Sequence, residues 1–237
     1  MIPLRDFRPS GSFPLGTVLI IALNVLVFFY ELSLSGLTDP QCSYLLDRLV
    51  SQHSCFFFQY GLVPHWLLSS PGDSFALATL PLWTTVFTSM FVHANFLHIL
   101  GNMWFLWIFG DNVEDAFGSL NYLFFYLFSG LMAALSQVLS DPGSQVPMIG
   151  ASGAIAGVMG AYMVLYPWGR VRTLLIIIIV DLPAVVILGI WLGVQILVPQ
   201  GGVAAMAHVG GFTTGALIAW LVKRRRRRLA PADYSFW

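Results

Sequence analysis

Charged side chains are scarce in this sequence. Only 9% of its 237 residues are Asp, Glu, Lys or Arg, whereas 57% are hydrophobic. Soluble globular domains carry about 25% charged residues, so the composition excludes an ordinary water-soluble domain. The sequence therefore predicts an integral membrane protein. The formal net charge of zero adds little, because the placement of the few charges is more informative than their sum.

Six apolar stretches divide the chain, at 15–34, 95–109, 120–139, 152–166, 173–198 and 206–222. About 20 apolar residues span a bilayer core. The first, third and fifth stretches reach that length. The other three are shorter, so either their polar flanks enter the membrane or their ends lie inside the bundle. No Ala-x-Ala cleavage site follows the first stretch, which is long for a signal peptide, so we expect it to be retained.

These stretches predict an all-α membrane protein with six transmembrane helices and a long external loop at 36–83. We expect a cytoplasmic lead at 1–14, one six-helix domain at 15–222 and a basic cytoplasmic tail at 223–237. The loop is rich in aromatic residues, which favour the membrane interface. Short helices lying in that plane are therefore expected there, rather than a soluble domain.

Basic residues are almost absent from one side of this predicted topology. Of the eleven Lys and Arg residues, only Arg48 falls on the side opposite the two termini. Because basic loops remain in the cytoplasm, this predicts cytoplasmic termini and a location in the inner or plasma membrane. The basic run at 223–228 fits an anchor on the anionic inner leaflet. The lipid bilayer is thus an expected partner, and nucleic acid is not.

The sequence has only two cysteines, Cys42 and Cys55, and both lie in the expected external loop. Outside the cytoplasm, two cysteines favour a disulfide, with two unpaired thiols as the alternative.

A serine, Ser152, lies between glycines in the segment Gly150-Ala-Ser-Gly. Gly150 permits a sharp turn before the fourth apolar stretch. Two helices also carry faces of small residues that let them pack closely, formed by Gly153, Gly157 and Gly160 in the fourth stretch and by Gly211 and Gly215 in the sixth. Taken alone, this motif favours helix packing with an incidental serine.

A histidine, His208, begins the sixth apolar stretch. If the two glycine faces meet, His208 lies close to Ser152, where a neutral imidazole can take the proton of a serine hydroxyl. His98 and Asn102 are four residues apart on the second stretch, so they share a helix face and could donate to an oxyanion. No carboxylate lies at that depth on the neighbouring stretches, which predicts a Ser–His dyad without a third acid.

One acid, Asp181, lies inside the fifth apolar stretch, two residues before Pro183. Intramembrane acids are functional candidates by default. Because Asp181 lies toward the cytoplasmic side, far from Ser152, we expect a structural hydrogen-bonding role near a proline kink.

These residues resemble the rhomboid family of intramembrane serine proteases. Three motifs match. They are the segment from His93 to Asn102, the segment Gly150-Ala-Ser-Gly, and the segment Ala207-His208-Val-Gly-Gly. The resemblance implies that Ser152 is the nucleophile and His208 the general base. It implies that His98 and Asn102, with the Ser152 backbone N–H, stabilise the oxyanion. Transmembrane protein substrates would be cleaved near the outer membrane boundary, without a metal or cofactor.

The sequence departs from the family pattern at two places. Thr84 follows Trp83, where many members carry Trp-Arg, and Ala156 replaces an aromatic residue that packs on the catalytic histidine in some members. Two other functions are compatible with a polytopic membrane protein. An inactive rhomboid-like membrane chaperone or adaptor would usually lack the serine or the histidine, and both are present. A small-solute transporter is disfavoured because the six stretches show no evident internal repeat.

Overall fold

The computed structural model describes residues 1–34, 36, 38–46, 49–69, 81–198 and 203–229. Arg48, parts of the expected external loop at 70–80 and the end of the expected tail at 230–237 lie outside the described residues. The described chain is mainly helical, as the apolar stretches predict. Its long helices are α1 (Leu15–Ser33), α6 (Phe96–Phe117), α7 (Ser119–Ser140), α8 (Ser152–Leu165), α9 (Ala184–Leu197) and α10 (Ala205–Leu229).

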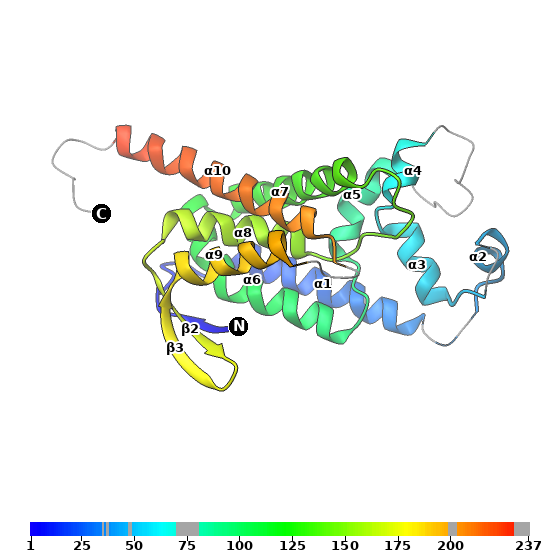
Figure 1. Ribbon diagram of the computed structural model, residues 1–237, viewed down its shortest axis with the longest axis horizontal. Coiled ribbons are helices and arrows are strands. Elements are labelled where there is room, and N and C mark those ends of the chain that lie inside the picture. The colour runs from blue at the N-terminus through cyan, green and yellow to red at the C-terminus, as the bar shows by residue number, and fades with distance from the viewer. Residues whose placement is uncertain (35, 37, 47–48, 70–80, 199–202, 230–237) are drawn as a thin grey trace.

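The central helix of the bundle is α8, which lies among α6, α7, α9 and α10 (Figure 1). Residues 153–162 of α8 are all buried, because small side chains let neighbouring helices approach from several sides. The closest approach is to α10. A methyl group added at Gly211 would overlap the backbone carbonyl of Gly153, and one at Gly215 would overlap that of Gly157. The two glycine faces therefore meet almost backbone to backbone.

Three described helices, α1, α7 and α10, are long and apolar enough to cross a membrane. The helices α6 and α10 contain 22 and 25 residues, so the polar flanks of the second and sixth apolar stretches are helical. The acidic residues Asp111, Glu114 and Asp115 lie within the last two turns of α6. By contrast, α8 and α9 are short apolar helices of 14 residues each. The count of six spans stays a prediction.

Two buried carboxylates tie the ends of α1 to the bundle. At its start, Glu114 of α6 accepts the backbone N–H groups of Gly16 and Thr17 at 2.7 and 2.8 Å. The helix has no side-chain cap of its own, so Glu114 satisfies its free N–H groups. Near the other end, both oxygens of Glu31 accept the backbone N–H of His93 at 3.2 Å. This contact holds the loop that precedes α6.

The segment between α1 and α6 contains several short helices, as predicted from its composition. Their bounds are α2 (Pro40–Leu45), α3 (Gln52–Tyr60), α4 (Pro64–Leu68), η2 (Leu82–Thr84), α5 (Thr85–Thr88) and η3 (Ser89–Phe91). A disulfide joins Cys42 to Cys55, with their Cα atoms 5.9 Å apart. It links α2 to α3, and both cysteines are buried.

The fifth apolar stretch, 173–198, is not a single helix, and that prediction is wrong. Residues 170–183 form a hairpin of β2 (Arg170–Leu175) and β3 (Ile178–Pro183). The strand β1 (Ile2–Asp6) pairs with β2, which gives an antiparallel sheet in the order β1-β2-β3. Isoleucine and valine favour strands, and Pro183 stands at the N-cap of α9, so the helix begins only at Ala184. The mainly helical bundle therefore carries one small antiparallel sheet.

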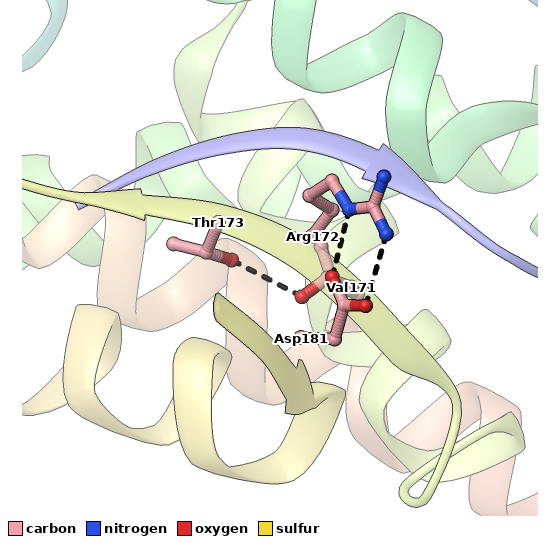
Figure 2. A network of polar contacts seen from close by, with 4 residues as sticks. All are labelled: Val171, Arg172, Thr173 and Asp181. Carbon is pink, nitrogen blue, oxygen red and sulfur yellow. Dashed lines mark hydrogen bonds and ion pairs between the residues drawn. The ribbon is translucent and has the colours of Figure 1, made fainter. Parts of the chain in front are cut away.

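The position predicted for Asp181, at a kink inside a transmembrane helix, is also wrong. Asp181 lies on β3, where its carboxylate accepts hydrogen bonds from Nε and Nη2 of Arg172 at 2.8 and 3.1 Å (Figure 2). These bonds, together with the positive charge of Arg172, hold the pKa of Asp181 below its usual value. Asp181 therefore forms a cross-strand ion pair on an exposed hairpin rather than lying at a kink in a helix.

Candidate active site

Ser152 and His208 lie in contact at the starts of two neighbouring helices. Ser152 is the first residue of α8, and His208 lies in the first turn of α10. The His208 Nε2 is 2.8 Å from the Ser152 Oγ, which is hydrogen-bond distance. The glycine contacts between α8 and α10 explain this proximity. Gly153 follows Ser152 directly, and its carbonyl lies against Gly211, three residues after His208.

The turn before Ser152 requires a glycine. Gly150 has φ +115°, a left-handed conformation that side chains disfavour, and its N–H donates to the Ser89 carbonyl at 2.8 Å. A methyl group added at Gly150 would also lie 2.6 Å from His98 Nε2 and 3.6 Å from Asn102 Nδ2. The absence of a side chain therefore lets the turn lie against both donors.

A cavity of about 390 Å³ opens at this point in the bundle. Its lining includes Ser152, His208, His98, Asn102 and Gly150. Most of the other lining residues are small or apolar. The cavity therefore brings together all four residues predicted to act in catalysis.

The donors of His98 and Asn102 are available to a group in this cavity. Asn95 caps α6 by accepting the His98 backbone N–H at 2.9 Å, which sets the start of that helix. The His98 Nδ1 accepts the Ala94 N–H at 3.4 Å, which favours the tautomer with its proton on Nε2, the nitrogen next to Gly150. Asn102 is 8% exposed, and its buried Nδ2 has no hydrogen-bond partner among the described residues. A buried donor without a partner is suited to an incoming oxygen.

Comparison with known proteins identifies the family. A family model described as "Rhomboid domain" matches residues 81–225, more than half of the chain. The chain belongs to the rhomboid family. The match includes all three motifs, the helices α6 to α9 and α10 as far as residue 225.

Several rhomboid proteins are similar to this chain. Over 166 residues it is 27% identical to Rhomboid protein 1, mitochondrial, of Saccharomyces cerevisiae, covering 64% of this chain and 47% of the relative. It is 31% identical to Rhomboid-like protein 11, chloroplastic, of Arabidopsis thaliana, and the matched region covers 61% of this chain and 54% of that relative. It is 26% identical to Rhomboid protease AarA of Providencia stuartii, and the matched region covers 95% of this chain and 80% of that relative. The chain spans about half the length of the first two relatives.

Two residues near the rhomboid motifs contact His208 and were missed by the sequence analysis. The Gln195 Oε1 lies 2.7 Å from the His208 Nδ1, and the Trp191 ring centroid lies 5.6 Å from the centroid of the imidazole. Both belong to α9. The prediction of a dyad rests on the absence of a carboxylate at this depth and takes no account of amides. A glutamine in an otherwise apolar helix, four residues after a tryptophan, is the signal that could have found them.

One cluster of potential metal ligands lies close together in the described part of the chain, but its cysteines are not available to a metal ion. Among the described residues, one such cluster consists of Asp39, Cys42 and Cys55. Both cysteines are in the disulfide and carry no thiolate that could bind a metal.

Proposed function

We propose that this rhomboid is an intramembrane serine endopeptidase with Ser152 as nucleophile and His208 as general base. The observation that carries the proposal is the 2.8 Å contact between Ser152 Oγ and His208 Nε2 beside a cavity in the bundle. A serine hydroxyl is a weak nucleophile unless a base takes its proton, and this contact supplies the base. The relative named as a protease, AarA, supports the same activity.

In the proposed reaction, His208 Nε2 takes the Ser152 proton while Oγ bonds to the carbonyl carbon of the scissile peptide. The carbonyl oxygen becomes negative, and Asn102 Nδ2, His98 Nε2 and the Ser152 backbone N–H are the proposed donors to it. The protonated His208 then gives its proton to the leaving amine, and an ester remains on Ser152. Water, deprotonated by His208, hydrolyses that ester and regenerates the hydroxyl.

We further propose that the substrates are transmembrane proteins cut near the outer boundary of the inner or plasma membrane. The sheet and the basic end of α10 lie at one end of the bundle, and α2, α3 and α4 lie at the other (Figure 1). Because all but one of the basic residues lie toward the first end in the predicted topology, we assign that end, with both termini, to the cytoplasm. Ser152 starts a helix that runs from the opposite end, which favours cleavage in the external half.

Cleavage of a model transmembrane substrate by the purified protein tests this function. Ser152→Ala and His208→Ala should each abolish cleavage without lowering the melting temperature in detergent, because each removes half of the nucleophile–base pair. A fluorophosphonate should label the wild type and not Ser152→Ala. An inactive rhomboid-like chaperone or adaptor would bind the substrate, leave it intact and remain unlabelled. Cleavage by Ser152→Ala above a no-enzyme control would refute the assignment.

A further inference from the structure

The helix α9 presents two side chains to His208, one turn apart. The Gln195 side chain is 8% exposed, and its Oε1 lies 2.7 Å from His208 Nδ1. The centroid of the Trp191 ring lies 5.6 Å from that of the imidazole. The Trp191 ring also stacks on Phe212 of α10, with 6.1 Å between the ring centroids. Both ring nitrogens of His208 are therefore occupied, Nε2 by Ser152 and Nδ1 by Gln195.

The partner of Nδ1 determines what Nε2 can do. An amide oxygen is an acceptor only, so the contact with Oε1 requires the proton of the neutral ring to be on Nδ1. The Nε2 lone pair is then free to accept the Ser152 hydroxyl proton, as a general base must. With the proton on Nε2 instead, the ring would donate to Ser152 and could not act as its base.

We propose that Gln195 is a positioning residue: its side-chain oxygen holds His208 in the tautomer and ring orientation that direct the Nε2 lone pair at Ser152. This inference rests on the proposed function of Ser152 and His208. It replaces the expected dyad by a Ser–His–Gln arrangement in which the third group is an amide. Trp191 assists by contacting the imidazole ring from the same helix.

Position 156 of α8 carries no aromatic ring, so it supplies no ring contact to His208. Ala156, one turn after Ser152, is buried and has only a methyl group. In this chain the aromatic contact comes from Trp191. No described carboxylate hydrogen-bonds to His208, whose partners are Ser152 and Gln195.

An amide suits this position better than an acid would. A carboxylate buried in a membrane bundle must lose its hydration, which is costly. The Gln195 oxygen accepts the Nδ1 proton without that cost. Its hydrogen bond to the protonated ring lacks the attraction between opposite full charges that a carboxylate would add. Gln195 therefore orients the base more than it stabilises the imidazolium.

Three variants of the full chain in detergent test the proposal. Gln195→Met keeps the length and the apolar stem and removes the acceptor. It should lower kcat roughly 10- to 100-fold, as loss of a histidine's orienting partner does elsewhere, with KM changed less than about threefold. Gln195→Glu restores an acceptor, so its kcat should be at least about tenfold higher than that of Gln195→Met. Val194→Ala, on the exposed side of α9, should leave kcat unchanged.

The pH profile separates positioning from a packing role. The carboxylate introduced by Gln195→Glu favours the protonated form of His208, which cannot act as a base. Activity on the acid side of the profile should therefore be lost at a higher pH than in the wild type, by about one unit. A side chain at position 195 that packed without contacting His208 would leave the profile of every active variant unchanged.

Two results would overturn the inference while the proposed function stands. The first is wild-type kcat in Gln195→Met. The second is an equal loss in Gln195→Met and Gln195→Glu, accompanied by a lower melting temperature and an unchanged pH profile. A wild-type protein that neither cleaves a transmembrane substrate nor reacts with a fluorophosphonate would instead refute the proposed function itself.

Discussion

The contact between α8 and α10 predicts a large effect from the smallest possible substitution, Gly211→Ala. The added methyl group would overlap the backbone carbonyl of Gly153, which cannot rotate away as a side chain could. Either the helices move apart or α8 shifts along α10. Both changes act on Ser152, because it directly precedes Gly153.

The magnitude follows from the geometry. Adding a methyl group to a packed interface costs about 1–3 kcal/mol of stability. The Ser152–His208 contact of 2.8 Å would leave hydrogen-bond range after a shift of about 1 Å. A misplacement of that size can lower a rate about 10²-fold. Gly211→Ala should therefore lose roughly two orders of magnitude in kcat while remaining folded.

The matched control is Gly189→Ala on α9. A methyl group added there meets nothing within 4 Å, so this variant should gain about 0.5–1 kcal/mol from helix propensity and keep its activity. Thermal unfolding in detergent and kcat on one model substrate, measured on the same preparations, compare the two. If Gly211→Ala matches Gly189→Ala in both measurements, the argument that backbone contact sets the Ser152–His208 distance is wrong.

Two further predictions concern the oxyanion and the external loop. Asn102→Ala should lower kcat by up to about 10²- to 10³-fold with little change in KM, since its unpaired Nδ2 would act mainly in the transition state; a destabilised variant with normal turnover would exclude Asn102 from catalysis. Cys42 and Cys55 should resist thiol reagents in intact cells until a reductant is added, and reduction should cost roughly 3 kcal/mol of stability; prompt labelling without reductant would contradict the disulfide.

Much of the candidate site could be predicted from the sequence because its parts are local. The turn at Gly150, the serine at the start of a helix and the glycine spacing are all properties of short segments, as is the four-residue step from His98 to Asn102. The membrane class follows from composition alone. Once the family motifs are recognised, their order along the chain predicts which segments must meet.

The hairpin at 170–183 could not be predicted from hydropathy. A run of four isoleucines has the apolar character of a transmembrane helix, and nothing in its length distinguishes the two. Pairing of β2 with β1, a strand more than 160 residues earlier in the chain, satisfies backbone groups on the edge of β2 that the hairpin alone leaves free, and hydropathy does not report this contact. Asp181 was misplaced for the same reason.

Only the tertiary structure decided what orients His208. Gln195 is thirteen residues from His208, on a different helix, and its contact depends on how α9 is rotated against α10. No local pattern encodes that rotation, because it results from side-chain packing between the helices. The sequence alone determined the residues that can carry out the chemistry. Packing decided which neighbour contacts the proposed base, and that neighbour is an amide rather than an acid.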